Sequence, residues 1–286
     1  MKKILIVGSH GMAGHVIKRI LSDTGKFNVF DIARNSEYGN VSYELNVSNF
    51  EKLGNIIREV SPEYIINCIG ILNNDAEEHP AKSILINSYL PHYLAEQCDS
   101  LDSKLIHISS DCVFSGVTGD YIETDLKDGI GFYAQSKALG EVAYGKHLTI
   151  RTSIIGPELK RNGIGLLHWF LHQKGEIKGY TNALWSGVTT IQLAKSVLFI
   201  LSGNDISGIV HLTNNKKISK YDLLMNFKEL FNRNSLVINP YDQFKVDKSV
   251  LNTRGDFNPS IPSYDDMLEE LKEWIYLNKN IYSYSL

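Results

Sequence analysis

The chain has 286 residues, of which 43% are hydrophobic and 21% are charged. This length and composition allow one large domain or a main domain with a smaller appendage, and they exclude a disordered or fibrous protein. The 29 basic and 32 acidic side chains give a net charge of −3, and because no run or stripe of lysine and arginine is present, we expect neither nucleic acid nor a membrane as a partner.

Three cysteines, Cys68, Cys98 and Cys112, are an odd number without CxxC spacing. The sequence therefore indicates neither a disulfide framework nor a zinc site, and we expect a reducing cytoplasm. The first apolar run, KKILIVG at residues 2–8, ends in a glycine-rich stretch that makes it too short for the hydrophobic region of a secretion signal. No other segment approaches the length of a membrane span.

Strand and helix patterns alternate along the first half of the chain, beginning with a buried strand at residues 2–8. We predict strands also at residues 27–32, 42–47, 63–70, 103–110 and 148–155, and helices at residues 12–21, 49–60, 81–97 and 133–146. This alternation predicts an α/β fold with right-handed crossovers, which is a Rossmann doubly wound parallel sheet.

Beyond residue 156 the alternation is less regular. We predict helices at residues 165–173, 189–203, 218–231 and 264–277, and a strand at residues 208–214. Residues 1–156 then form the main domain, and residues 157–286 mainly form a smaller α/β domain, with the helix at 189–203 packing back on the first domain.

Glycines at positions 8, 11 and 14 lie between the first strand and the first helix, in the sequence GSHGMAG. In dinucleotide-binding proteins such glycines permit a tight turn (Gly8), a close approach of the backbone to a pyrophosphate (Gly11) and close packing of helix on strand (Gly14). A plain glycine-rich turn is the alternative. The strand before the glycines and the helix after them favour a site for a nicotinamide dinucleotide in residues 1–156.

The second strand ends near two residues that bear on which cofactor is used. Asp31 lies near the offset expected of an acceptor for a ribose hydroxyl, which favours NAD, whereas Arg34 can pair with a 2′-phosphate, which favours NADP. We expect NADPH, with NADH as the alternative.

Tyr133 and Lys137 are four residues apart in a predicted helix, so they share one face. An ammonium within about 6 Å of a phenol favours the phenolate and lowers its pKa, which would make Tyr133 a general acid for a carbonyl under reduction. Ser110 ends the strand at 103–110, at the edge where ligands of parallel sheets bind, and is expected to donate to the same oxygen. The alternative for Tyr133 and Lys137 alone is a surface pair.

Together these residues resemble the extended short-chain dehydrogenase/reductases, and within them the dTDP-4-dehydrorhamnose reductase branch. The resemblance spans essentially the whole chain. It is carried by GSHGMAG (8–14), Asn87, SSDCVFSG (109–116), GDYIETD (119–125), YAQSK (133–137) and RTSIIG (151–156).

The resemblance implies a role for each matching residue. Ser110, Tyr133 and Lys137 would form the catalytic triad, and Lys137 would also hold the nicotinamide ribose. The cofactor would in addition be bound by Gly8, His10, Gly11, Met12, Gly14, Asp31, Arg34, Asn46, Val47, Cys68, Ile69, Gly70 and Asn87, with Asn46 and Val47 beside the adenine.

The chain departs from the rhamnose enzymes at several positions. Cys112 stands where they carry a tyrosine, Ser110 replaces a threonine and Asn46 replaces an aspartate. Residues 175–195 and 246–257 look more like reductases of UDP-linked 4-keto-6-deoxy-N-acetylhexosamines. We therefore expect a reductase of such a sugar in cell-surface polysaccharide biosynthesis, an oxidoreductase of the EC 1.1.1 class.

Three alternatives remain open. The substrate can be dTDP-4-dehydrorhamnose, or the chain can be a non-catalytic NADP-binding regulatory subunit. An epimerase or dehydratase would need a further acid or base, for which Glu123 in a predicted loop is the available residue. We also consider a homodimer.

Further residues are assigned to the substrate. Asp111 and Cys112 join Ser110 at the pocket wall, Asn182 and Trp185 could flank the sugar and nucleobase, and Arg254 could grip the diphosphate; a surface salt bridge is the alternative for Arg254. His168 and His172 share a helical face, but no third ligand is legible, so we expect no metal.

Overall fold

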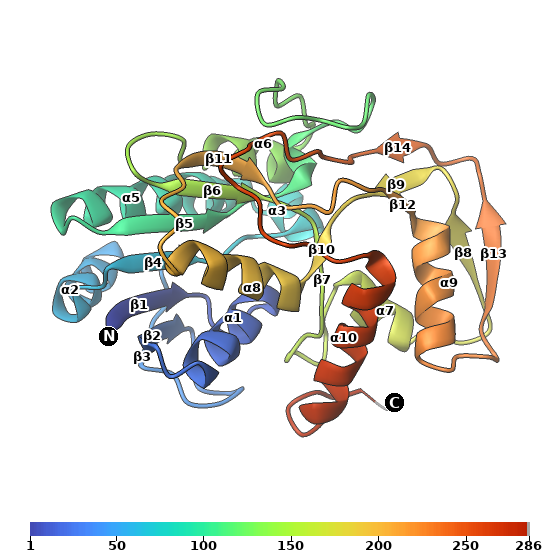
Figure 1. Ribbon diagram of the computed structural model, residues 1–286, viewed down its shortest axis with the longest axis horizontal. Helices are drawn as coiled ribbons and strands as arrows, with labels where there is room; N and C mark the ends of the chain where they lie inside the picture. Colours follow the sequence, from blue (N-terminus) through green and yellow to red (C-terminus); the bar gives the residue numbers. More distant parts are fainter. Residues whose placement is uncertain (285–286) are drawn as a thin grey trace.

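The computed structural model describes residues 1–284, and its centre is a parallel sheet of seven strands in the order β11-β6-β5-β4-β1-β2-β3 (Figure 1). The strands are β1 (Lys2–Val7), β2 (Phe27–Ala33), β3 (Tyr43–Glu44), β4 (Tyr64–Asn67), β5 (Lys104–Ile108), β6 (Leu148–Arg151) and β11 (Gly208–His211). All six neighbouring pairs are parallel. The predicted Rossmann sheet is confirmed.

Helices cover both faces of this sheet, and β1 shows why. Ile4 and Ile6 belong to one hydrophobic core, and Leu5 and Val7 belong to the other. Alternate side chains of a strand point to opposite faces, so a strand buried on both sides must be apolar throughout. Helices α1 (Met12–Asp23) and α8 (Thr190–Leu201) contribute to the first core, and α2 (Phe50–Val60) and α5 (Leu90–Ser100) to the second.

The helix predicted at residues 81–97 is three segments: α4 (Pro80–Ser83), the π-helical η1 (Ile84–Tyr89) and α5. Pro91 has no N–H to donate to the carbonyl of Asn87, so a regular α-helix cannot continue through this point, and a π-helical turn precedes it. The sequence pattern did not distinguish this break, because the apolar spacing persists across it.

The helix predicted at residues 133–146 is also shorter: α6 (Phe132–Leu139) ends at Gly140. A Cβ atom at Gly140 would lie 1.8 Å from the carbonyl oxygen of Asn87. Glycine therefore lets the end of α6 pack directly on η1.

The C-terminal half forms small sheets and helices on one side of the main sheet (right in Figure 1). Strand β8 (Glu176–Tyr180) pairs with β13 (Val237–Tyr241), while β9 (Ala183–Trp185) lies between β12 (Ile218–Ser219) and β14 (Val246–Asp247). These short strands were not predicted from the sequence. Its helices here correspond to α7 (Leu166–Leu171), α8, α9 (Lys220–Leu230) and α10 (Tyr264–Leu277).

Two elements after residue 156 belong to the main layers. The strand β11 extends the main sheet beyond β6, and α8 packs beside α1. Two short strands, β7 (Ile154–Ile155) and β10 (Val188–Thr189), pair with each other. The chain leaves the main sheet through β7, which follows β6, and returns to the main layers through β10, which precedes α8. The division into two domains at residue 156 stays a prediction.

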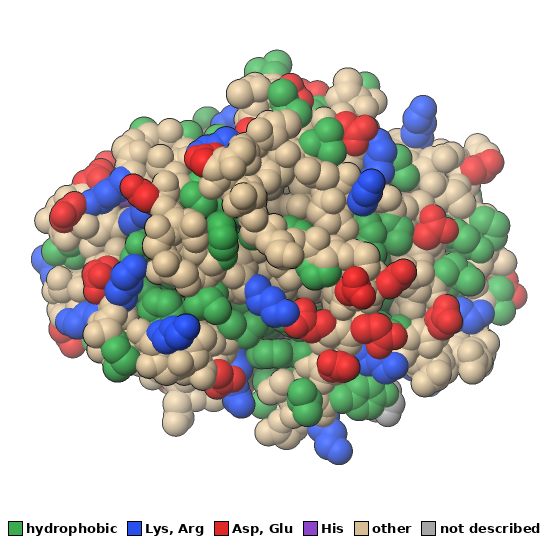
Figure 2. Space-filling view, in the orientation of Figure 1, with side chains coloured by type: hydrophobic (Ala, Val, Ile, Leu, Met, Phe, Trp, Pro, Cys, Tyr) green, Lys and Arg blue, Asp and Glu red, His purple; other side chains and the backbone are tan. Residues whose placement is uncertain are grey.

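Charged side chains of both signs are interspersed over the face in Figure 2, and acidic ones gather around α10. In residues 1–284 no helix has the length and apolar character needed to cross a bilayer.

Candidate active site

The three glycines form a tight cradle between β1 and α1. Gly8 has φ +94°, a conformation that favours glycine, and a Cβ there would lie 2.5 Å from the Ile69 side chain. A Cβ at Gly14 would lie 2.2 Å from the carbonyl oxygen of Gly8. Gly11 directly precedes α1. The glycine loop therefore leaves the N-terminus of this helix facing the space beyond the carboxyl end of β1.

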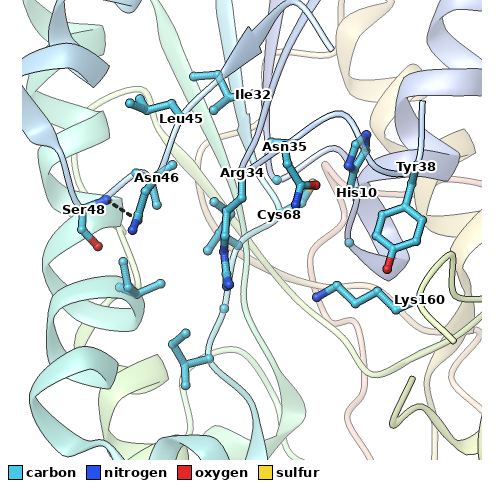
Figure 3. Close-up of a pocket in the computed structure, with 18 of the residues that line it drawn as sticks. His10, Ile32, Arg34, Asn35, Tyr38, Leu45, Asn46, Ser48, Cys68 and Lys160 are labelled. Atoms are coloured by element: carbon cyan, nitrogen blue, oxygen red, sulfur yellow. Dashed lines mark hydrogen bonds between the residues drawn. The ribbon is translucent and has the colours of Figure 1, made fainter. Parts of the chain in front are cut away.

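A cavity of about 490 Å³ lies over this cradle, beyond the carboxyl ends of β1, β2 and β4 (Figure 3). Most residues predicted to bind the cofactor line it: Gly8, His10, Gly11, Arg34, Asn46, Val47, Cys68, Ile69 and Gly70. The site is therefore where Rossmann folds hold a dinucleotide, at the carboxyl edge of a parallel sheet.

Asp31 does not line this cavity, contrary to the prediction. Its side chain is buried, with Lys18 Nζ 2.9 Å from Oδ2, while the amide and hydroxyl of Ser42 each donate to Oδ1 at 3.0 Å. Burial raises the pKa of Asp31, but hydrogen bonds from Ser9, Lys18 and Ser42 outweigh it, so the net pKa is lowered. A carboxylate occupied in this way ties β2 to the following loop.

Arg34, three residues later, does line the cavity. Among residues 1–284 its guanidinium has no side-chain hydrogen bond or ion pair. It remains available to an anionic group.

Asn87 and Gly14 also lie outside the cavity. The side-chain amide of Asn87 donates to the carbonyl of Ile71 at 2.9 Å and to Ser136 Oγ at 3.0 Å, and its Oδ1 accepts from the amide of Ile71 at 2.8 Å. Asn87 therefore fixes the loop after β4, which lines the cavity. Gly14 acts through the close packing of α1 on the glycine loop.

A second cavity of about 350 Å³ adjoins the first and contains the predicted catalytic residues. Ser110, Tyr133 and Lys137 all line it, as do Met12, Asp111 and Cys112. His10, Gly11, Cys68, Ile69, Gly70 and Lys160 line both cavities. A ligand that fills the first cavity can therefore extend to the catalytic residues.

Ser110 is held by its neighbours. Its hydroxyl donates to Asp111 Oδ1 at 3.1 Å and accepts from the amide of Cys112 at 3.1 Å. The Ser110 side chain also opposes the rise in the pKa of the Tyr133 phenol.

Lys137 is buried and points to the end of β5. Its ammonium donates to the carbonyl of Ile108 at 2.8 Å, and its Nζ lies 3.4 Å from His107 Nε2. Burial lowers the pKa of Lys137 to about 8, and interactions with Glu141 and Cys68, which raise the pKa, only partly oppose it.

The pKa of Tyr133 differs in direction from the prediction. Burial raises it, Cys112 and Asp111 raise it further, and Lys137 does not contribute to it. The expected lowering is wrong for this structure because the ammonium is directed at a backbone carbonyl. Tyr133 therefore keeps its proton at neutral pH, which is the form that a proton donor needs.

Sequence reasoning missed a buried polar chain behind Lys137. Asn67 Nδ2 lies 3.1 Å from His107 Nδ1, and both residues are fully buried in β4 and β5. Burial, followed by the charge of Lys137, lowers the pKa of His107 well below its usual range. The signal that could have found this chain is a polar residue inside an otherwise apolar strand.

Asp111 and Cys112, which were predicted to form the wall of the substrate pocket, line the second cavity. Burial and then the charge of Asp111 raise the pKa of the Cys112 thiol to about 11. Cys112 is therefore a neutral thiol at physiological pH and forms part of the wall.

Asn182, Trp185 and Arg254 lie outside both cavities. Asn182 donates from its side-chain amide to the carbonyl of Asp242 at 3.0 Å, and Trp185 is a core residue with 4% exposure. Neither Asn182 nor Trp185 lies on the wall of a cavity, and their contact with the substrate stays a prediction.

Arg254 lies at the wrong edge of the sheet. Its guanidinium donates to the carbonyls of Ser207 at 2.9 Å and Ile209 at 3.1 Å, and it pairs with Asp256. Ser207 directly precedes β11, so Arg254 is at the amino edge of the sheet, away from the cavities. The alternative of a surface salt bridge describes Arg254 correctly.

His168 and His172 stack with ring centroids 4.4 Å apart. In the part of the chain that the structure describes, no group of three or more potential metal ligands comes together.

Lys220, at the start of α9, is a further residue that sequence reasoning missed. Its ammonium lies 5.2 Å from the centroid of the Trp185 ring. Burial lowers its pKa to about 8, and Asp111 and Cys112 oppose that change, which places Lys220 near the catalytic cavity.

Comparisons with known proteins agree with this geometry. The family model described as the RmlD substrate binding domain matches residues 1–249. The dTDP-4-dehydrorhamnose reductase of Aggregatibacter actinomycetemcomitans is 29% identical over 234 residues, which cover 78% of this chain and 76% of that protein. The enzyme of the same name from Escherichia coli is 28% identical over 231 residues, with 77% and 75% covered.

The crystal structure of a dTDP-4-dehydrorhamnose reductase from Bacillus anthracis in complex with NADP superimposes with a TM-score of 0.81 at 19% identity, covering 95% of this chain and 98% of that one. This likeness confirms the fold. Because the family model matches most of the sequence, the chain belongs to the RmlD substrate-binding-domain family.

Proposed function

We propose that this protein is an NADPH-dependent reductase of a nucleotide-linked 4-keto-6-deoxy sugar. The observation that carries the proposal is the convergence of Ser110, Tyr133 and Lys137 on a cavity that continues into the glycine cradle. Family membership agrees with the predicted oxidoreductase, because the relatives above are named as reductases of a sugar.

The residues of the first cavity fit a nicotinamide dinucleotide. The cradle of Gly8, Gly11 and Gly14 leaves room for a pyrophosphate at the start of α1, whose first turn has no acidic side chain. Arg34 is free to pair with a 2′-phosphate, and the relative from Bacillus anthracis is in complex with NADP. Asp31, the residue that favoured NAD, is occupied by Lys18 and Ser42. We therefore infer a preference for NADPH.

When bound, the nicotinamide supplies the hydride that reduces C4 of the sugar. Tyr133 gives its proton to the carbonyl oxygen, so the ketone becomes an alcohol and a tyrosinate remains to be reprotonated. Ser110 can turn its hydroxyl from Asp111 to the same oxygen and stabilise the developing charge. Lys137, which lines the same cavity and is charged below about pH 8, would hold the nicotinamide ribose.

For the sugar, dTDP-4-dehydrorhamnose is now favoured over the UDP-linked N-acetylhexosamine that the sequence analysis expected. Several relatives carry the name dTDP-4-dehydrorhamnose reductase, and Arg254 and Trp185, which lie in or near the segments that suggested the UDP sugar, are outside the cavities. The cytoplasmic location and the homodimer stay predictions.

An epimerase or dehydratase is less well supported, because Glu123 is not available as a base. Its carboxylate accepts from the hydroxyl of Thr253 at 2.6 Å and from the amide of His211 at 3.1 Å. A purely regulatory subunit would not need Ser110, Tyr133 and Lys137 to meet in one cavity.

The test is the consumption of NADPH, followed by absorbance, with a panel of dTDP- and UDP-linked 4-keto-6-deoxy sugars. We expect turnover with dTDP-4-dehydrorhamnose at the highest kcat/KM. A higher kcat/KM for a UDP-N-acetyl sugar would return the assignment to that substrate. Binding of NADPH without turnover of any member would support the regulatory subunit instead.

A further inference from the structure

We infer that Lys160 contacts the pyrophosphate of the bound dinucleotide and covers the junction between the two cavities. This inference rests on the proposed function, since it concerns the same cofactor. Lys160 lies in the loop between β7 and α7, outside the glycine motif, and nothing in the sequence pattern singles it out.

The loop that carries Lys160 is fixed against the start of α1. The amide of Gly165 donates to Glu158 Oε1 at 2.6 Å, and the amide of Glu158 donates to the hydroxyl of Tyr284 at 2.8 Å. A Cβ atom at Gly165 would lie 2.3 Å from Met12 Cε, so the loop packs on the first residue of α1. The loop is thereby held over the end of the helix that attracts anions.

The position of Lys160 relative to the glycine loop follows from three observations. Lys160 lines both cavities together with His10 and Gly11. Burial lowers the pKa of His10. The charge of Lys18 and, most weakly, that of Lys160 lower it further against Asp31 and Glu37, so Lys160 lies within electrostatic range of the imidazole. In Figure 3 the Lys160 side chain is drawn below His10 and Tyr38.

Among residues 1–284 the ammonium of Lys160 has no hydrogen bond or ion pair, which distinguishes it from Lys82, the other lysine of the first cavity. Lys82 Nζ is 3.1 Å from Asp75 Oδ2. A cation that lines a cavity without a partner suits an anionic ligand.

Arg34 and Lys160 serve different phosphates in this arrangement. Arg34 follows β2, where the adenine-side ribose of a Rossmann cofactor lies, whereas Lys160 lies over the glycine loop that faces the pyrophosphate. NADP and NAD share the pyrophosphate but differ in the 2′-phosphate. The two side chains can therefore be separated by comparing the two cofactors.

The experiment measures the Kd of NADP+ and of NAD+ by titration calorimetry for the wild type and for Lys160→Ala, Lys160→Arg, Arg34→Ala and, as a surface control, Lys174→Ala. We expect Lys160→Ala to raise both Kd values by about tenfold, because one charge-assisted hydrogen bond is lost. Lys160→Arg should restore much of the affinity, Arg34→Ala should weaken NADP+ alone, and Lys174→Ala should change neither Kd.

Unchanged Kd values for Lys160→Ala would overturn the inference while leaving the proposed function intact. A rise for NADP+ alone would also overturn it, because it would assign Lys160 to the 2′-phosphate. If the wild type bound neither cofactor, the proposed function itself would fail. Circular dichroism of each variant confirms that a loss of affinity is not a loss of folding.

Discussion

Tyr133 and Lys137 lie one turn apart on α6, yet their side chains have different partners. The Ser110 side chain acts on the pKa of Tyr133, whereas the ammonium of Lys137 donates to the carbonyl of Ile108. The two residues therefore share the cavity without forming a direct pair. Their common effect on a carbonyl depends on a ligand between them.

Replacing Tyr133 with phenylalanine removes the proton donor and keeps the ring. We expect kcat to fall by about 10³-fold, within the range of general acid catalysis, while the Kd of NADP+ stays nearly unchanged. Stopped-flow turnover and calorimetric titration measure the two quantities. Activity within a factor of two of the wild type would assign the proton to another group.

The effect of a buried ammonium on the free energy of unfolding can be tested at Lys220. Its pKa is lowered from 10.5 to about 8 by burial, so between these values the unfolded chain binds more protons than the folded one. The cost of burying the ammonium is fully present below about pH 8 and is relieved as the pH rises towards 10.5. Its place at the N-terminus of α9 adds to that cost, because a helix N-terminus disfavours cations.

We therefore expect Lys220→Met to stabilise the protein at pH 7, by about 1 kcal/mol, and to lose part of that advantage between pH 8 and 10. Denaturant unfolding at a series of pH values measures the difference from the wild type. Lys174→Met, at an exposed position, is the matched control and should show no such pH dependence. A destabilised Lys220→Met at pH 7 would contradict the prediction.

At the scale of elements, the position of α6 depends on its contact with η1. Gly140 packs on the carbonyl of Asn87, and Ser88 Oγ donates to the carbonyl of Ser136 at 2.8 Å. Because Tyr133 and Lys137 are on α6, this contact places the catalytic side chains. The π-helical turn thus affects the position of α6 in addition to lining the first cavity through Ile86.

Replacing Gly140 with alanine should therefore separate α6 from η1. We expect the free energy of unfolding to fall by about 3 kcal/mol through overpacking and kcat to fall with it. Gly255→Ala is the control, since nothing lies within 4 Å of a Cβ atom there, and it should be nearly neutral. Equal stability of the two variants in urea would show that the helices can separate at no cost.

A second contact joins the segment that follows α6 to strand β6. Arg151 Nε is 2.7 Å from Glu141 Oε1, and Nη2 donates to Oε2 at 2.9 Å, in a pair that is almost fully buried. Buried pairs of this kind are weak sources of net stability, but they specify one arrangement. Glu141 follows α6 directly, so the pair sets where the chain returns to the sheet.

At the scale of the whole molecule, the candidate active site draws on both halves of the chain. The cradle and the catalytic residues come from residues 8–137, whereas Lys160 and Leu159 come from the loop after β7. The second half in turn supplies β11 to the main sheet. A ligand that bridges these parts should stabilise the whole fold.

We expect a saturating concentration of NADP+, about 100 times its Kd, to add about 2.7 kcal/mol to the stability and to raise Tm by several degrees. Differential scanning calorimetry measures the shift. Adenosine monophosphate at the same concentration is the control and should give a smaller shift, because it reaches only part of the cavity. The absence of any shift with NADP+ would contradict the proposed cofactor site.

The sequence by itself determined the layers of the fold and the centre of the site. Apolar runs identified the strands because a parallel strand is covered on both faces. The spacing of Gly8, Gly11 and Gly14 identified the cradle, in which only glycine fits at positions 8 and 14. The order of Ser110, Tyr133 and Lys137 along the chain predicted that they meet at one edge of such a sheet, and all three line one cavity there.

Only the tertiary structure decided the partners of individual polar side chains. It turned Asp31 to Lys18 and Ser42, directed Lys137 at a backbone carbonyl, placed Arg254 at the opposite edge of the sheet and brought Lys160 over the glycine loop. Local periodicity reports which face of an element is buried. The partners of a long charged side chain, however, are residues far away in the sequence. They come within reach only when the elements pack.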